Sequence, residues 1–250
     1  MELIFLILIG FIAGGFGSLL GLGGGIIMVP AMTLIMGFSA KQAVSLSLMA
    51  VAAGSTGASI NFLRTGRTDL QLGLKLETIT TIGAVTGAII AGLINERYLL
   101  ISFAVILLYS ALSMMLPRKE IDENEYSGHP SRFGLGMIIS FIGGNISGLL
   151  GVGGGIIKVP VMNLLMGVPL KIASATSSYM IGITASTSAI VYLFRGDLYY
   201  GQAPPVILGI LAGSQIGARI SYKIKTIYLK WLFSVAIIYT AVRMLMKALQ

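Results

Sequence analysis

Seven long apolar runs place the strongest constraint on how this chain can fold. About 20 predominantly apolar helical residues cross the hydrocarbon core of a bilayer, and most of the runs approach that length. The chain is 56% hydrophobic and 10% charged over 250 residues, which is more apolar surface than one water-soluble core can hide. We therefore expect an all-α polytopic membrane protein. The runs are residues 3–20, 42–63, 78–94, 98–116, 172–194, 202–218 and 227–242.

One extended polar stretch, residues 117–132, divides the chain nearly in half. It mixes charges of both signs with Pro and Gly, which is typical of a solvated linker. We expect a first membrane repeat at 1–116, a cytoplasmic linker at 117–132 and a second membrane repeat at 133–250. Only Glu2 precedes the first apolar run, with no basic residue, so we expect a retained span rather than a cleaved signal peptide.

The two halves are copies of one another, offset by 130 positions. The segment LLGLGGGIIMVPAMTLIMG at 19–37 aligns with LLGVGGGIIKVPVMNLLMG at 149–167, and 13 of the 18 positions from Leu20 to Gly37 are identical. The same ungapped register continues through pairs such as Ser47 and Ser177 or Tyr109 and Tyr239. The duplication therefore covers whole repeats of about five helical segments each.

The basic residues indicate that the two repeats have opposite orientations. Lys and Arg are concentrated in cytoplasmic loops, and equivalent loops of the two repeats have opposite bias. In the first repeat, the loop after run 42–63 is basic, whereas the equivalent loop of the second repeat holds only Arg195. The next loop has the opposite bias, with only Arg97 in the first repeat and several basic residues in the second. We therefore predict two inverted repeats with both termini outside, although Arg243 and Lys247 then lie outside as well. The basic loops contain Arg64, Arg67 and Lys75 in the first repeat, and Arg219, Lys223, Lys225 and Lys230 in the second.

The glycine motif GLGGGIIMVP and its twin GVGGGIIKVP predict a break in each first helix. Each Gly costs about 1 kcal/mol relative to Ala in a helix interior, and residues 26–37 that follow are too short to cross a bilayer. We expect re-entrant hairpins at 3–37 and 133–167 that enter from opposite sides and meet at the midplane. The short helices would begin at Ile26 and Ile156, and their N-termini suit an anion.

The glycines have two other interpretations. A nucleotide-binding loop is disfavoured, because the motif matches neither G-x-x-x-x-G-K-[ST] nor G-x-G-x-x-G and lacks a polar βαβ unit. Close helix packing is the stronger alternative for any single glycine. The presence of two copies, each followed by Val-Pro at the same spacing, favours a functional break.

The chain resembles the TauE/SafE family of sulfite exporters, also called the TSUP family, whose hallmark is a duplicated G-x-G-G-G-x-x-x-V-P-type segment. The resemblance covers nearly the whole chain and implies a multi-pass carrier of the cytoplasmic (inner) membrane. Its substrate would be a small sulfur-containing or organic anion such as sulfite or a sulfonate, and the inverted repeats favour export by alternating access. The family segments correspond here to Gly21, Gly23, Gly24, Gly25 and Pro30, and to Gly151, Gly153, Gly154, Gly155 and Pro160.

Lys158 is the one large difference between the two motifs, since Met28 occupies the equivalent position. A Lys inside an apolar segment is costly and indicates a functional site, so we expect it to pair with a bound oxyanion. The alternative is that it snorkels or pairs with a carboxylate. We assign Gly21, Pro30, Gly151 and Pro160 to the structural break. The expected substrate-binding residues are Gly23, Gly24, Gly25, Ile26, Ser47, Asn145, Gly153, Gly154, Gly155, Ile156, Lys158 and Ser177.

The hydroxyl and amide candidates have alternatives of their own. Ser47 and Ser177 lie on the helix after each hairpin and could line an anion path, but small residues of this kind also mediate helix contacts. Asn145 could donate to a substrate or hydrogen-bond a turn. The acidic residues Asp69, Glu77 and Asp197 are placed near loops, so no carboxylate proton relay is expected.

The sequence also bears on other classes of function. The single His, His129, lies in the linker and the chain has no Cys, so no metal site, no cofactor and no catalytic residue are expected. The basic residues lie at the ends of apolar runs, which disfavours nucleic acid as a partner. The expected partners are a small anion and the bilayer, with a homodimer left open. A passive small-anion channel and a non-transporting membrane scaffold are the alternatives to a carrier.

Overall fold

A computed structural model describes residues 2–115, 121, 126, 128, 130–197, 201–221 and 226–249, with backbone alone at 114 and 226–233. Its regular structure is entirely helical in these ranges, as the apolar runs predicted. Each repeat contributes five helices, and a short π-helical segment, η2 (Val161–Leu165), continues α7. The helices are α1 (Glu2–Leu20), α2 (Gly25–Leu34), α3 (Ala40–Arg64), α4 (Leu70–Leu93), α5 (Glu96–Met115), α6 (Phe133–Leu150), α7 (Gly155–Pro160), α8 (Leu170–Phe194), α9 (Ala203–Ile220) and α10 (Thr226–Leu249).

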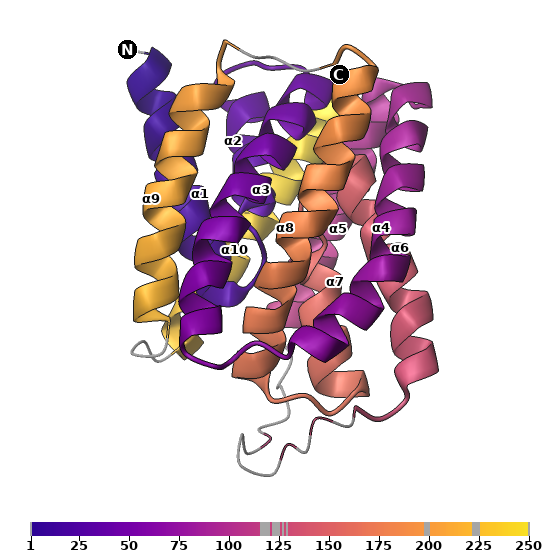
Figure 1. Cartoon of the computed structure of the whole chain (residues 1–250). Helices are drawn as coiled ribbons and strands as arrows, with labels where there is room; N and C mark the ends of the chain where they lie inside the picture. Colours follow the sequence, from indigo (N-terminus) through magenta and orange to yellow (C-terminus); the bar gives the residue numbers. More distant parts are fainter. Residues whose placement is uncertain are drawn as a thin grey trace.

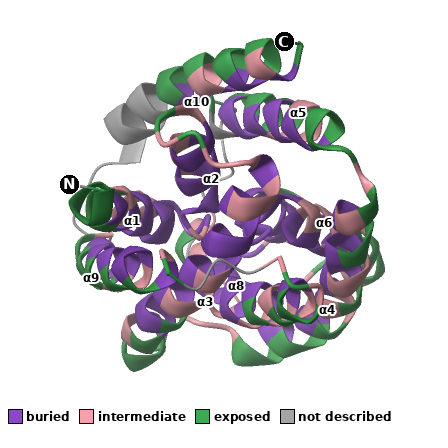
Figure 2. Ribbon diagram, turned by 90° about the horizontal axis from the view of Figure 1, so that it is seen from above, coloured by how far each residue is buried: buried purple, intermediate pink, exposed green. Residues whose placement is uncertain are grey.

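The helices bury an apolar core and many polar side chains, and they also expose many large apolar side chains, which is not expected of a water-soluble protein. Seven helices within the described ranges are long and apolar enough to span a membrane: α1, α3, α4, α5, α6, α8 and α9. Exposed residues form the rim of the molecule when it is viewed from above (Figure 2), and many of them are large and apolar, such as Leu3, Phe5 and Leu93. Lys158, Glu77 and many Ser and Thr side chains are buried inside. The protein is therefore a multi-pass membrane protein.

Helix pairs between the repeats hold the molecule together. The principal contacts are α1 with α9, α4 with α6, α3 with α8 and α5 with α10. In the 130-residue offset, α1 corresponds to α6, α4 to α9, α3 to α8 and α5 to α10. The pair α1–α9 is therefore equivalent to the pair α6–α4, and each of the other two pairs is equivalent to itself. The repeats are thus packed about an approximate two-fold relation, and neither repeat has a complete interior of its own.

Glycines allow the backbones of these pairs to approach closely, as is common between membrane helices. A Cβ atom added to Gly148 of α6 would lie 2.0 Å from the Ala84 carbonyl oxygen of α4, and one added to Gly87 of α4 would lie 2.0 Å from the Asn145 carbonyl oxygen. In the equivalent α1–α9 pair, a Cβ on Gly213 would lie 2.0 Å from the Phe11 carbonyl oxygen. Larger residues at these positions would push the repeats apart.

The ends of the chain lie on one side of the bundle. In Figure 1, α1 begins and α10 ends at the upper end, whereas α6 begins at the lower end. The first helices of the two repeats therefore start from opposite ends. Both helices lead to glycine turns in the buried interior.

The predicted helix breaks are confirmed, with one correction. α1 ends at Leu20 and α2 begins at Gly25, while α6 ends at Leu150 and α7 begins at Gly155. Pro30, which we had assigned to the break, instead lies inside α2. α7 ends at its equivalent, Pro160, and the π-helical η2 follows. A Pro in a helix removes one amide donor and clashes with the preceding turn, so these prolines alter the helix after the break without making the break.

The described parts of the linker pack against both repeats. The Tyr126 hydroxyl donates to Asp69 Oδ2 over 2.9 Å, and the Ser131 amide donates to the Met166 carbonyl over 2.9 Å. Burial and the hydrogen bond to Asp69 raise the pKa of Tyr126, so this phenol stays a donor at physiological pH. The extent of the linker, 117–132, remains a prediction.

We predict that Gly148→Ala destabilises the protein, because its new methyl group meets the Ala84 backbone in the α4–α6 contact. Overpacking of this kind costs about 1–3 kcal/mol of the free energy of unfolding, which a lower melting temperature in detergent would report. Gly134→Ala on the same helix is the matched control, since a Cβ there meets nothing within 4 Å. It should leave stability unchanged or raise it, and equal losses in both variants would contradict the packing described.

Candidate functional site

Two glycine turns form the centre of the molecule. We call Gly21–Gly24 the first glycine turn and Gly151–Gly154 the second. Their three glycines have left-handed backbones, with φ of 69°, 85° and 86° in the first turn and 71°, 82° and 74° at equivalent positions of the second. Only glycine adopts this region without strain, so the repeated glycines of the motif are required by the turn itself.

The two turns are in direct contact. A Cβ atom added to Gly25 would lie 2.3 Å from the Gly151 carbonyl oxygen, and one added to Gly155 would lie 2.4 Å from the Gly21 carbonyl oxygen. Each helix that follows a turn therefore begins against the turn of the other repeat. The sequence predicted that the hairpins meet, and the contacts between these residues show that they do.

Ser47 and Ser177 fasten this contact. The Ser47 hydroxyl donates to the Gly151 carbonyl over 2.7 Å, and the Ser177 hydroxyl donates to the Gly21 carbonyl over 3.1 Å. Both serines are fully buried, and each bonds the turn of the opposite repeat. Their one O–H is thus already used, and their binding of a substrate stays a prediction.

Apolar side chains fill the space beside the turns. Val51 and the equivalent Ile181 both lie against Gly23 and against Gly153, within 3.4 Å of a Cβ added at either glycine. Both side chains are completely buried. The centre between the two turns is therefore filled by side chains in this conformation.

The helices after the turns present their first amides toward the centre. The first bonds of α2 run from Ile27 and Met28 to the Gly24 carbonyl, and those of α7 run from Ile157 and Lys158 to the Gly154 carbonyl. The first backbone N–H groups of a helix have no acceptor within the helix. Here these are the amides of Gly25 and Ile26 in α2 and of Gly155 and Ile156 in α7. α7 is only six residues long, so any dipole at its start is weak, and Lys158 carries most of the positive charge on this side.

Lys158 pairs with a carboxylate. Its Nζ lies 3.1 Å from Glu77 Oε2, and the two side chains are only 1% and 3% exposed. The alternative that Lys158 binds a carboxylate is therefore confirmed, and the placement of Glu77 near a loop is wrong. Asp69 caps the helix by accepting from the Leu72 amide, so α4 begins at Leu70 and Glu77 is two turns inside it. Whether Lys158 also binds substrate remains a proposal.

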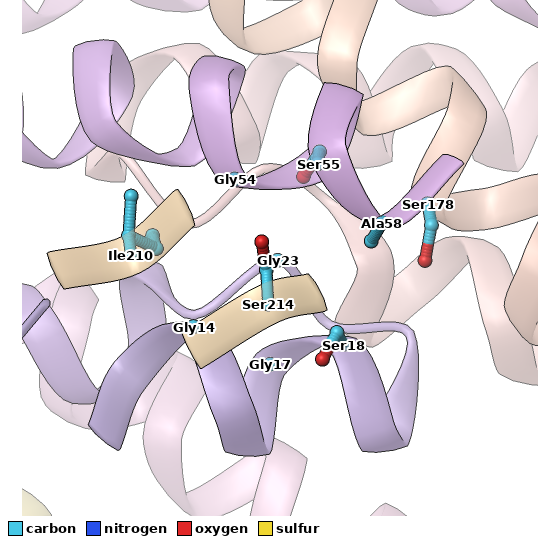
Figure 3. A pocket seen from close by; sticks show the side chains of 10 residues that line it. All are labelled: Gly14, Gly17, Ser18, Gly23, Gly54, Ser55, Ala58, Ser178, Ile210 and Ser214. Atoms are coloured by element: carbon cyan, nitrogen blue, oxygen red, sulfur yellow. The ribbon is translucent and has the colours of Figure 1, made fainter. Parts of the chain in front are cut away.

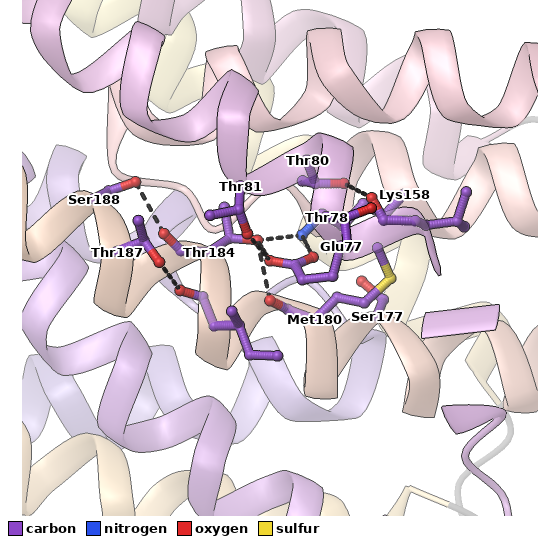
Figure 4. A network of polar contacts seen from close by, with 12 residues as sticks. Glu77, Thr78, Thr80, Thr81, Lys158, Ser177, Met180, Thr184, Thr187 and Ser188 are labelled. Atoms are coloured by element: carbon purple, nitrogen blue, oxygen red, sulfur yellow. Dashed lines mark hydrogen bonds and ion pairs between the residues drawn. The ribbon is translucent and has the colours of Figure 1, made fainter. Parts of the chain in front are cut away.

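Hydroxyl groups surround the ion pair (Figure 4). Lys158 Nζ donates to Thr184 Oγ1 over 2.6 Å, and Thr184 Oγ1 donates to Glu77 Oε1. Thr81, one turn along α4, donates to the same Glu77 oxygen over 3.3 Å. Lys158 and Thr184 belong to the second repeat, whereas Glu77 belongs to the first, so this polar cluster joins the two repeats.

Ser147 adds an unused hydroxyl to this cluster. It is fully buried, and within the described part of the chain its oxygen has no hydrogen-bond partner. A Cβ atom added to Gly154 would lie 3.2 Å from Ser147 Cβ and 3.4 Å from Lys158 Cε. Ser147 and Lys158 thus flank the second glycine turn.

The two-fold-related place beside the first glycine turn has no ion pair in the described structure. Met28, Ile207 and Gly54 occupy the positions of Lys158, Glu77 and Thr184. A cavity of about 10 Å³ lies there instead, with room for roughly one water molecule. Figure 3 shows the hydroxyls that line it, which are those of Ser18, Ser55, Ser178 and Ser214.

Asn145 lies apart from the glycine turns. Its Nδ2 donates to Thr86 Oγ1 over 3.0 Å, across the close α4–α6 contact. Neither interpretation from the sequence anticipated this bond between helices. The structure brings together the other predicted residues, namely the glycines, Ile26, Ile156, Lys158, Ser47 and Ser177.

Sequence reasoning missed Glu77, Thr184 and Ser147. The useful signal was Asp69, because an Asp before an apolar run is a preferred helix cap and would have extended the run 78–94 back to include Glu77. No group of three His, Asp or Glu side chains that could hold a metal occurs among the residues with described side chains. His129 lies outside the described residues.

A helical bundle with an apolar rim, interrupted helices and a buried charged cluster between two repeats is the architecture of a membrane transporter. Comparison with known families agrees. The chain belongs to the sulfite exporter TauE/SafE family, whose profile matches residues 6–244.

Individual relatives carry similar names. The chain is 28% identical to the probable membrane transporter protein YunE of Bacillus subtilis, over 90% of this chain and 91% of that protein. It is 28% identical to the probable membrane transporter protein ORF9 of Sinorhizobium, over 97% and 92%. A plant relative, sulfite exporter TauE/SafE family protein 1 of Arabidopsis thaliana, is 31% identical over 35% of this chain and 19% of its own. No solved structure matches the chain.

We predict a strong coupling between Glu77 and Lys158 in a double-mutant cycle. Lys158→Met or Glu77→Gln alone should lower the free energy of unfolding by about 3–5 kcal/mol, because each leaves a buried group without its partner. The double variant should lose much less than the sum. Unfolding in mixed detergent micelles provides the measurement, and additive losses would show that the pair contributes nothing as a pair.

Proposed function

We propose that the protein exports a small sulfur-containing or organic anion, such as sulfite or a sulfonate, across the cytoplasmic membrane by alternating access. The observation that carries this proposal is the buried cluster at the second glycine turn. There Lys158, Thr184 and Ser147 form a set of donors inside a membrane protein. A buried cation with hydroxyl donors suits an oxyanion, and its position beside a helix break suits a transport site.

The size of the site favours a small substrate. The polar cluster around Lys158 and the two glycine turns are almost completely buried, and Val51 and Ile181 fill the space between the turns. A compact anion with several oxygens could exchange contacts with Lys158, Thr184 and Ser147 after a modest separation of the repeats. A large substrate would require the glycine turns themselves to part.

The packing of the repeats supports movement around this site. We infer that the repeats are inverted, because their first helices start from opposite ends and the principal helix pairs exchange under the repeat relation. Rocking of one such repeat against the other would open the glycine turns to one side at a time. A membrane potential that is negative inside favours export of an anion by about 2.3 kcal/mol per charge at 100 mV.

We predict that the purified protein binds one sulfur oxyanion selectively at Lys158. Binding of sulfite, sulfoacetate, thiosulfate and acetate would be measured by calorimetry, with thermal shift as a second readout. Lys158→Met should abolish the binding, because it removes the cation. The double variant Glu77→Gln/Lys158→Met is the control for stability, since it lacks the charge without leaving an unpaired carboxylate. Unchanged binding in both variants would contradict the site.

Flux through proteoliposomes separates a carrier from the alternatives. A carrier should saturate and should move labelled sulfite faster when unlabelled sulfite is present on the other side. A passive channel would conduct with little stimulation by exchange, and a scaffold would show no flux. Either of these two results would contradict alternating access.

A further inference from the structure

We propose that the Glu77 carboxylate is an internal substitute for the transported anion. In the empty carrier it occupies the position of the anion beside Lys158, and it thereby allows the empty carrier to change orientation. This inference rests on the function proposed above. It states that one residue, Glu77, allows the carrier to return without substrate. Four observations support it.

First, the Glu77 carboxylate makes the contacts that an oxyanion would make. One of its oxygens accepts from Lys158 Nζ over 3.1 Å, and the other accepts from Thr184 and Thr81. Sulfite and sulfonates present the same kind of negatively charged oxygens to the same donors. The carboxylate and a substrate anion would therefore compete for Lys158.

Second, Lys158 needs an anion beside it at all times when the site is closed. Its side chain is 1% exposed, and a buried cation without a partner is strongly unfavourable. Glu77 is the charged side chain that faces Lys158 in the described structure. On the helices packed around Glu77, α6 carries no titratable side chain, and α8 carries Lys171, Tyr179 and Tyr192.

Third, Glu77 and the donors Lys158 and Thr184 belong to different repeats. Glu77 lies on α4 of the first repeat, whereas Lys158, Thr184 and Ser147 lie on α7, α8 and α6 of the second. Movement of one repeat against the other would change the distance from Glu77 to Lys158 but keep the donors together. Thr81, on α4 itself, would stay within reach of the displaced carboxylate.

Fourth, the donor set exceeds what Glu77 uses. Ser147 is fully buried beside Lys158, and its hydroxyl has no partner in the described chain. An uncompensated buried hydroxyl is uncommon, and a bound oxyanion would supply its acceptor. The two-fold-related positions, Met28 of the first repeat and Ile207 of the second, show that the fold forms at the other glycine turn without an ion pair.

The inference predicts a difference between net efflux and exchange. In the wild-type carrier, Glu77 would neutralise Lys158 after the substrate leaves, so the empty carrier could return. Without this carboxylate the carrier could return only with an anion bound. A variant that lacks the carboxylate should therefore catalyse exchange but little net efflux.

The experiment uses the full-length protein in proteoliposomes loaded with ³⁵S-sulfite. Efflux into buffer without sulfite measures the empty return, and efflux into unlabelled sulfite measures exchange. Glu77→Gln should lower net efflux by at least about 10-fold and keep exchange within about 3-fold of wild type. The Kd of this variant for sulfite should fall, because the competing Glu77 carboxylate is gone. Glu77→Asp, which keeps the charge, should restore most of the net efflux.

The controls separate this inference from a folding defect and from the proposed function. Glu77→Gln/Lys158→Met carries no buried charge and should remain folded by size exclusion and melting temperature, yet bind no sulfite. Equal loss of exchange and net efflux in a folded Glu77→Gln variant would overturn the substitute role. So would sulfite uptake driven by an imposed pH gradient that Glu77→Gln abolishes, since Glu77 would then carry a proton. A wild-type protein that neither binds nor exchanges sulfite would contradict the proposed function itself.

Discussion

The contact between the two glycine turns is the constraint on which the rest of the structure depends. A helix broken inside a membrane exposes peptide groups that lipid cannot satisfy, and such breaks are tolerated only where protein or water covers them. Here each turn covers the other. The Gly151 and Gly21 carbonyls accept from serines of the opposite repeat, and the glycines at the start of α2 and α7 leave room for the approach. Neither turn would be satisfied without the other repeat.

This mutual dependence explains how a charged pair can be placed in the interior. Burial of two charges is expensive and the pair itself contributes little net stability, so the energy that holds Glu77 against Lys158 must come from the surrounding packing. The close α4–α6 contact supplies it, because the glycines of both helices bring α4 near the second glycine turn. The polar site is therefore held in position by apolar and backbone contacts on either side.

Much of this architecture could be predicted from the sequence, because it depends on repeated local patterns. The helix breaks follow from glycines that only a left-handed turn requires, and the meeting of the hairpins follows from their duplication. The partner of Lys158 could not be found in this way. Glu77 lies 81 positions earlier in the sequence, on the other repeat, and no local pattern connects the two. The role of Asn145 could not be predicted for a different reason. A polar residue between apolar helices can bind a substrate or a neighbouring helix, and only the packing of α4 on α6 shows which of the two it contacts.

The difference between the two halves has a consequence for stoichiometry. Two identical repeats related by a two-fold axis would contain two charged sites, one at each glycine turn. In this chain Met28 of the first repeat and Ile207 of the second occupy the places that correspond to Lys158 and Glu77, and a small serine-lined cavity lies near the first glycine turn. Of the two glycine turns, one therefore has a charged pair beside it in the described structure. Under the proposed function, each chain would carry a single anion per cycle, and a binding isotherm would saturate at one equivalent.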